Sequence, residues 1–84
     1  MQCDCCDYYT VTAGHDYEIC PVCYWEQDWQ GVSEPDEQSG ANHGLTLRDG
    51  RRNFLAIGVC AAQFKSNVVT TLEREKYRHV ARSI

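Results

Sequence analysis

The 84-residue chain is predicted to form a small α+β domain, and three features of the sequence predict this class. Two Cys-x-x-Cys pairs lie near the N-terminus. The residues between the pairs are rich in β-branched and aromatic types, and two helix-capping patterns lie in the second half of the chain. We therefore expect a single domain over residues 1–84, with a zinc-ribbon-like β-hairpin part over 1–29, a loop over 30–44, and a part with two or three helices over 45–84.

The two cysteine pairs have the spacing of a four-thiolate metal site. In each pair, two intervening residues allow one tight turn to aim both sulfurs at a common point, and a tetrahedral Zn²⁺ ion needs four such ligands. A domain of this length buries a limited core, so bound zinc is expected to contribute on the order of 10 kcal/mol to folding. Cys5 could replace a neighbouring ligand, but the choice of Cys3 and Cys6 gives both pairs the same gap. The predicted zinc ligands are Cys3, Cys6, Cys20 and Cys23.

The same cysteines could instead form disulfides or take part in thiol redox chemistry. The N-terminus has no charged leader and no apolar run, so we expect no secretory signal and no passage into an oxidising compartment. No segment is long and apolar enough for a membrane span. These features favour a metal site in a soluble, cytoplasmic protein. A closed four-thiolate site offers no open position to a substrate, and no nucleophile is paired with a base, so we expect the protein not to be an enzyme.

Two segments between the cysteine pairs predict the β-hairpin. Residues 8–12 and 16–19 are rich in aromatic and β-branched types, and the Ala-Gly-His run over 13–15 is a turn signal. Such a hairpin would carry the first cysteine pair to the second. His15 lies at the expected tip of the turn, where we expect it to face solvent, because four cysteines already fill a tetrahedral site. Residues 30–44 contain glycine, proline and several acids without a helical period, which predicts a long loop that is either mobile or used for binding.

Two capping patterns predict the helices. Thr46 and Asp49 have the spacing of a capping box, and the apolar residues that follow recur at helical intervals, with a stop or kink expected at Gly58. Residues 70–73 give a second capping signal, and the helix that follows is expected to run for about a dozen residues to the C-terminus. Cys60 lies in an apolar helical stretch, where we expect a buried thiol that packs as a small hydrophobe.

Four blocks of the sequence resemble, in the same order, the small cysteine-rich CPCC proteins. The resemblance covers roughly residues 3 to 60 and implies a small zinc-binding protein. Asp4 replaces the proline that names the family, and Asp7 replaces the glycine that usually follows the pair. Because aspartate adopts a left-handed conformation less readily than glycine, the first cysteine turn is expected to be looser than the second. The matching blocks are Cys3-x-Cys5-Cys6, residues 17–26, Gly40-Ala41-Asn42, and residues 45–58.

The two tryptophans follow the second cysteine pair in an aromatic and acidic segment. Tryptophan buries a large area and dominates both cores and interfaces, so one of the two is expected in the core. Trp25 belongs to one of the blocks that resemble the family, and we therefore predict that Trp25 is a core residue and that Trp29 lies on the surface.

Charge is divided unevenly along the chain. Residues 1–47 contain nine acids and no lysine or arginine, whereas residues 48–84 contain eight bases and three acids, so the formal charges are −9 and +5. Nucleic acid is the less favoured partner, because its phosphates would be repelled by the acidic half. Bases in the predicted C-terminal helix could still contact phosphates, but they alternate with two acids, which is typical of a solvated, ion-paired face. These bases are Arg74, Lys76, Arg78, His79 and Arg82.

An acidic, aromatic surface on a metal-stabilised scaffold suits the capture of a basic protein, because charge steers the encounter and aromatic side chains supply binding energy. Small acidic antidotes that neutralise basic bacterial toxins have this profile, and what the family resemblance suggests is compatible with it. We therefore expect a zinc-binding interaction protein, foremost an immunity protein that neutralises a toxin domain. The alternative is a zinc-ribbon nucleic-acid-binding or transcription-associated protein that uses the basic C-terminal helix. The expected partner-binding residues, here called the acidic face, are Glu26, Asp28, Trp29, Glu34, Asp36 and Glu37.

Overall fold

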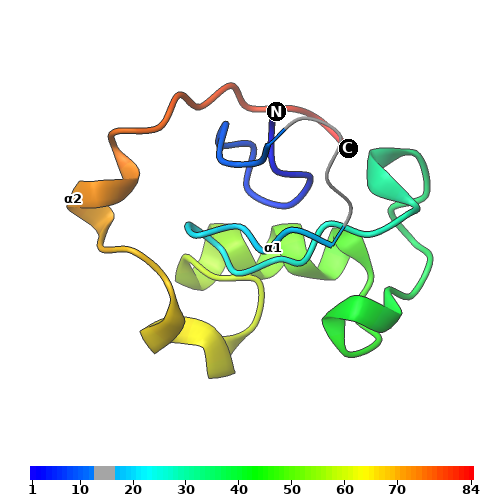
Figure 1. Ribbon diagram of the computed structural model, residues 1–84. Coiled ribbons are helices and arrows are strands. Elements are labelled where there is room, and N and C mark those ends of the chain that lie inside the picture. The colour runs from blue at the N-terminus through cyan, green and yellow to red at the C-terminus, as the bar shows by residue number, and fades with distance from the viewer. Residues whose placement is uncertain (13–16) are drawn as a thin grey trace.

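Helix α1 (Leu47–Ile57) is the longest helix in the described part of the chain and crosses the middle of the molecule (Figure 1). The computed structural model describes residues 1–12 and 17–84. The predicted capping box is present: the Thr46 side chain accepts a hydrogen bond from Asp49 N at 3.0 Å, and the Asp49 side chain accepts one from Thr46 N at 3.4 Å. Gly58 ends the helix in the left-handed conformation, with φ of 80°. Both predicted boundaries of this helix are confirmed.

Gly50 allows helix α1 to approach the cysteine-rich part of the chain closely. A Cβ atom at this position would lie 2.9 Å from Trp25 Cζ3 and 3.4 Å from Cys5 Sγ. Trp25 and Leu47 are each 1% exposed. The core therefore forms between the helix and the two cysteine pairs, and Trp25 is a core residue as predicted.

The C-terminal helix is much shorter than predicted. Helix α2 (Thr71–Arg74) has the expected capping interaction, because the Thr70 side chain accepts a hydrogen bond from Glu73 N, but it contains only four residues. Leu72 is 76% exposed, so the apolar positions of this segment do not form a buried face. A short helix without such a face is unstable in water. The prediction of about a dozen helical residues at the C-terminus was wrong.

The chain after α2 runs back in an extended conformation to the N-terminal segment (Figure 1). Tyr9 N donates a hydrogen bond to Arg78 O at 2.8 Å, and Val80 N donates one to Asp7 O at 3.4 Å. Backbone groups that a helix would pair internally are therefore paired with residues beside the first cysteine pair. This long-range pairing replaces the predicted helix.

The β-hairpin predicted from residues 8–12 and 16–19 is not confirmed. Residues of the first segment pair with the C-terminal chain. Residues of the second segment pair with those that follow Cys23, because the Cys20–Cys23 turn reverses the chain. The predicted turn over 13–15, including His15, lies outside the described residues. The described residues form no sheet. They form isolated antiparallel bridges, which join Tyr8 to His79, Ile19 to Glu26, and Gln38 to Thr46.

Residues 30–44 consist of turns and two short 3₁₀ segments, and two buried polar side chains hold this loop in place. Asn42 Oδ1 accepts a hydrogen bond from Glu26 N, and Asn42 Nδ2 donates one to Glu26 O, both at 2.8 Å. Ser39 Oγ donates to Asp28 Oδ2 at 2.6 Å. The loop is thereby attached to the acidic residues that follow the second cysteine pair.

Three 3₁₀ helices complete the described elements: η1 (Gly31–Ser33), η2 (Gly40–Asn42) and η3 (Ala62–Asn67). The radius of gyration is 11.4 Å. A compact chain of this length is expected to have a value of about 12 Å, so the fold is a small compact domain with a few helices. Neither α1 nor any other helix in the described ranges is long and apolar enough to cross a membrane.

Candidate metal centre

Four cysteine sulfurs converge in the N-terminal half of the chain. The Sγ atoms of Cys3, Cys6, Cys20 and Cys23 all lie within 4.8 Å of one another. Cys3 and Cys23 are separated by 3.6 Å between their sulfurs, and Cys6 and Cys20 by 3.7 Å. Tetrahedral zinc with Zn–S bonds of about 2.3 Å gives sulfur–sulfur edges of about 3.8 Å. The four predicted ligands are thus brought together at a spacing that suits a metal ion, and each is at most 3% exposed.

The two cysteine pairs fold into matching turns, here called the first knuckle (residues 3–8) and the second knuckle (residues 20–25). In each knuckle, the carbonyl of the first cysteine accepts a hydrogen bond from the residue after the second cysteine, from Asp7 N at 3.2 Å and from Tyr24 N at 2.9 Å. Both of these residues have φ of 68°, in the left-handed region. A backbone N–H inside each turn donates to the first sulfur at 3.4 Å. This shared geometry explains why spacing alone predicted which cysteines converge.

Two side chains outside the turns also reach the sulfurs. Gln27 Nε2 lies 3.4 Å from Cys3 Sγ and donates to it, and the Thr10 hydroxyl lies 3.0 Å from Cys20 Sγ. Such donors stabilise the negative charge of metal-bound thiolates and orient the ligands. Cys6 Sγ accepts no N–H or O–H hydrogen bond from the described residues, so it is the ligand least stabilised by its surroundings. No local pattern in the sequence marks Gln27 or Thr10, so neither residue was predicted as part of the site.

Four thiols this close cannot all ionise without a cation. Burial raises the pKa of the Cys23 thiol, and the hydrogen bond with Cys20 raises the pKa of the Cys6 thiol. Hydrogen bonds with Cys23, Cys3 and Cys6 lower the pKa of the Cys20 thiol. A bound divalent cation would supply the charge that stabilises all four as thiolates. The donor set, its spacing and its hydrogen bonds therefore fit a thiolate-bound metal ion.

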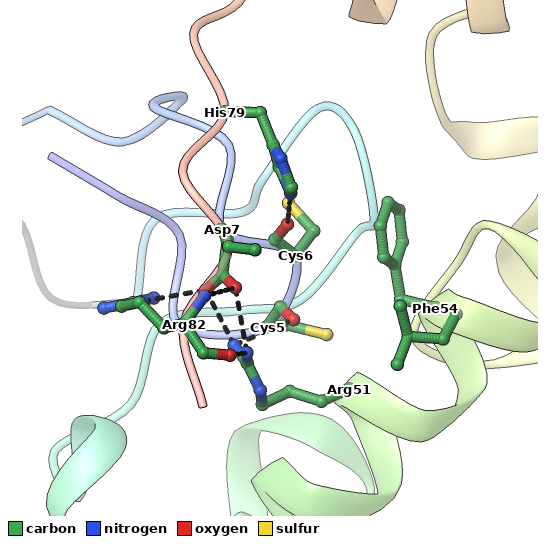
Figure 2. Close-up of a pocket in the computed structure, with 9 residues that line it drawn as sticks. Cys5, Cys6, Asp7, Arg51, Phe54, His79 and Arg82 are labelled. Atoms are coloured by element: carbon green, nitrogen blue, oxygen red, sulfur yellow. Dashed lines mark hydrogen bonds and ion pairs between the residues drawn. The ribbon is translucent and has the colours of Figure 1, made fainter. Parts of the chain in front are cut away.

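A buried ion-pair network holds the first knuckle in place (Figure 2). Asp7 is 4% exposed, and its carboxylate accepts four hydrogen bonds: from Arg51 Nη1 at 2.8 Å and Nη2 at 2.9 Å, and from Arg82 N and Nε at 2.8 Å each. Burial alone would raise the pKa of Asp7, but these hydrogen bonds outweigh it and lower the pKa to about 2. The expectation of a loose first knuckle does not fit this geometry, because the network holds Asp7 in the left-handed conformation.

The same two arginines also bind backbone carbonyls of the first knuckle. Arg51 Nη1 donates to Asp4 O at 2.7 Å, and Arg82 Nη2 donates to Cys3 O at 2.8 Å. Sequence reasoning missed these contacts. The one available signal was the opposite charge of the two halves of the chain, which here attract each other within one fold.

The two remaining cysteines are buried beside the cluster. Cys5 is 2% exposed and Cys60 is 0% exposed. Cys60 N donates to Cys23 O at 2.8 Å, and burial raises the pKa of the Cys60 thiol to about 12. Cys60 is a buried thiol as predicted, although it lies beyond the end of α1 rather than in a helix.

The residues of the acidic face have different surroundings. Trp29 is 71% exposed, and Glu34 and Glu37 are also exposed. Asp36 is exposed but forms an ion pair with Arg48 at 2.7 Å, so part of its charge is neutralised within the fold.

The other two acids of this face lie closer to the core. Asp28 is half-buried, and its carboxylate accepts hydrogen bonds from Ser39 Oγ and from Trp29 N. Glu26 is half-buried and lines a cleft together with Tyr24 and Phe64. Trp29 is therefore exposed next to a hydrogen-bonded Asp28, whereas Glu26 is part of the wall of a cleft.

Comparison with known proteins gives one family match. A family model described as "Cysteine-rich CPCC" matches residues 1–75. No curated protein and no solved structure matches the chain significantly.

Proposed function

The chain belongs to the cysteine-rich CPCC family, and we propose that it is a zinc-binding interaction protein whose acidic face captures a basic protein. Zinc binding is supported by one observation, the convergence of four buried thiols at a tetrahedral spacing. Four thiolates in this arrangement are typical of structural zinc. When bound, the ion would link the two knuckles and stabilise a domain that buries little apolar core.

The proposed role of the metal is structural rather than catalytic. All four sulfurs are buried, and together they occupy every position of a tetrahedral ion, so no position is left for a substrate. Assays for hydrolase and thiol-exchange activity are expected to remain at background. Turnover that disappears in Cys5→Ser would contradict this role, because Cys5 lies outside the cluster of four.

The capture of a basic protein is supported by the exposure of Trp29 in the same segment as unpaired acids. A tryptophan that is 71% exposed offers a large apolar area to a partner, and its backbone is anchored by the Asp28 carboxylate. Among the described residues, no lysine or arginine forms an ion pair with Glu34 or Glu37. An exposed aromatic side chain together with acids that have no basic partner suits a basic protein, because charge steers the encounter and the aromatic ring supplies binding energy. A basic toxin domain neutralised by this protein is the partner class that we propose.

The nucleic-acid alternative depends on a long basic helix at the C-terminus, and helix α2 contains four residues. Arg82 pairs with Asp7, whereas Arg78 lies over the Tyr9 ring at 4.8 Å. These bases do not share one helical face, so no observation favours this alternative.

A pull-down from the native host would test the proposal. Wild-type protein is expected to recover a basic protein, and Trp29→Ala is expected to accelerate its dissociation by removing an anchor. Neutralising Glu34, Asp36 and Glu37 together should slow association, most clearly at low salt. Neutralising Glu73 and Glu75 serves as the matched control, which should leave association unchanged. Recovery of nucleic acid alone, or binding that depends on Arg78 and ignores the acidic face, would overturn the proposal.

A further inference from the structure

The cleft that Glu26 lines lies beside the second knuckle, because Tyr24 of that knuckle is also part of its wall. It has a volume of about 250 Å³ and is lined by Tyr24, Glu26, His43 and Phe64, among others. The Tyr24 and Phe64 rings have centroids 4.7 Å apart with an interplanar angle of 35°, and the His43 and Phe64 rings have centroids 5.8 Å apart at 33°. Three rings from separate parts of the chain therefore line one cleft together with Glu26.

Two of these rings are held by backbone that is unfavourable for their residue types. Tyr24 has φ of 68° and His43 has φ of 60°, both in the left-handed region. The knuckle itself requires this conformation, since Asp7 has the same φ in the first knuckle, and glycine would adopt it at least cost. Bulky residues in strained positions are found at sites where the side chain has a use. The knuckle thus fixes the backbone that carries the Tyr24 ring, and Tyr24 lines the cleft.

Glu26 supplies the charge of this cleft. Its backbone N–H and C=O both pair with the Asn42 side chain at 2.8 Å, and Ile19 bridges to it, so its position is fixed. Its side chain is half-buried. In the part of the chain that the structure describes, no cation forms an ion pair with the Glu26 carboxylate. A carboxylate that lines a cleft together with aromatic rings is complementary to an organic cation.

We propose that this cleft binds the guanidinium group of an arginine side chain. A guanidinium is planar, so it stacks on an aromatic face while its N–H groups donate to one carboxylate, and it is more weakly hydrated than an ammonium. The assignment rests on the proposed capture of a basic protein, and it names where one arginine of that partner is held. Glu26 accepts the hydrogen bonds, and the Phe64 and Tyr24 rings provide the stacking surface.

Titration of the zinc-loaded protein with N-acetyl-arginine amide, followed by amide NMR shifts, would test this assignment. N-acetyl-citrulline amide is the matched probe, because it has nearly the same shape without the charge. The arginine probe is expected to bind with a Kd in the millimolar range and to shift the amides of Glu26 and His43, whereas the citrulline probe should cause little change. Equal shifts from both probes would overturn the proposal.

Variants separate the cleft from the rest of the acidic face. Glu26→Gln and Phe64→Leu, both outside the cluster of four thiols, are expected to weaken binding of the arginine probe by about five- to tenfold, while Glu37→Gln should leave it unchanged. Weakening by Glu37→Gln that equals the effect of Glu26→Gln would contradict the assignment. If a captured basic protein binds the Glu26→Gln and Phe64→Leu variants as tightly as wild type, the cleft assignment fails and the proposed function stands. If the arginine probe binds but no basic protein is captured, the proposed function fails instead.

Discussion

Replacing Asp7 by asparagine would remove the charge that holds the first knuckle while keeping the shape of the side chain. Asparagine also tolerates the left-handed conformation, so the substitution leaves the backbone preference nearly unchanged. What is lost is the charged acceptor of four hydrogen bonds from Arg51 and Arg82. The amide of the new side chain would in addition place an N–H₂ group against these donors. The test therefore isolates the ion-pair network from the strain of the knuckle.

The expected loss of stability follows from the burial of the three side chains. Removing one partner of a buried ion pair typically costs about 3–5 kcal/mol, because it leaves charges without a counterion. The Asp7 side chain is 5% exposed, whereas those of Arg51 and Arg82 are 15% and 28% exposed. Because the arginines can regain some hydration, we expect Asp7→Asn to lower the free energy of unfolding by about 2–4 kcal/mol.

Urea unfolding of the zinc-loaded protein at pH 7 would measure this change. Arg52→Gln is the matched control, since Arg52 pairs with Asp49 at 3.5 Å and both side chains are well exposed. It should change the free energy of unfolding by no more than about 0.5 kcal/mol. A change of similar size in both variants, or an Asp7→Asn protein as stable as wild type, would refute the reasoning.

The pH dependence gives the same test a second readout. The hydrogen bonds of the network lower the folded pKa of Asp7 to about 2, below the unfolded value of about 3.9. The contribution of Asp7 to stability is therefore complete above about pH 4 and is lost as the pH falls toward about 2. The difference between wild type and Asp7→Asn should be equal at pH 7 and pH 5. It should become smaller at pH 3, where the unfolded chain binds the proton and the folded protein does not. A difference that stays the same at pH 3 would show that folded Asp7 titrates near its ordinary pKa.

Three further predictions test the metal centre and its supports. Elemental analysis should find one zinc per chain, and zinc-free protein with intact disulfides would contradict the metal site. Cys20→Ser should abolish soluble folding, whereas Cys60→Ser should lower the free energy of unfolding by about 1–2 kcal/mol. In urea unfolding, Gly50→Ala should destabilise the protein by about 1–3 kcal/mol, because its Cβ would lie 2.9 Å from Trp25 Cζ3. Gly40→Ala is the control and should be nearly neutral, because the space around Gly40 is open. Gln27→Ala should lower zinc affinity roughly tenfold in competition with a chelating dye, because Cys3 Sγ loses a donor, and an unchanged affinity would rule out that role.

The features that could be predicted from the sequence depend on residues a few positions apart. The two-residue gap fixes which cysteines share a turn, and the capping box of Thr46 and Asp49 with Gly58 fixes both ends of α1. The capping signal at Thr70 was also correct, but it sets only where a helix begins. The length of α2 depends on whether its apolar residues are buried, and Leu72 remains exposed. No local pattern contains that information.

The features that were missed join residues far apart in sequence. Arg82 donates to Asp7 across 75 positions, and Arg51 does so across 44. Reading Asp7 alone suggested a weak knuckle, because the cost of its left-handed backbone is visible in the sequence while the compensating contacts are not. The charge asymmetry of the two halves was the visible trace of these contacts. It was interpreted mainly as a binding surface, whereas Asp7 and Asp36 form ion pairs within the fold.

The two knuckles have the same backbone but carry different side chains at the same position. Each requires a left-handed residue after its second cysteine, and neither uses glycine. In the first knuckle this residue is Asp7, whose carboxylate fastens α1 and the C-terminal segment to the centre. In the second it is Tyr24, whose ring lines the cleft with Glu26 and Phe64. Since both side chains are aimed by turns that bound metal would fix, occupancy of the centre would determine both the closure of the fold and the shape of the proposed binding cleft.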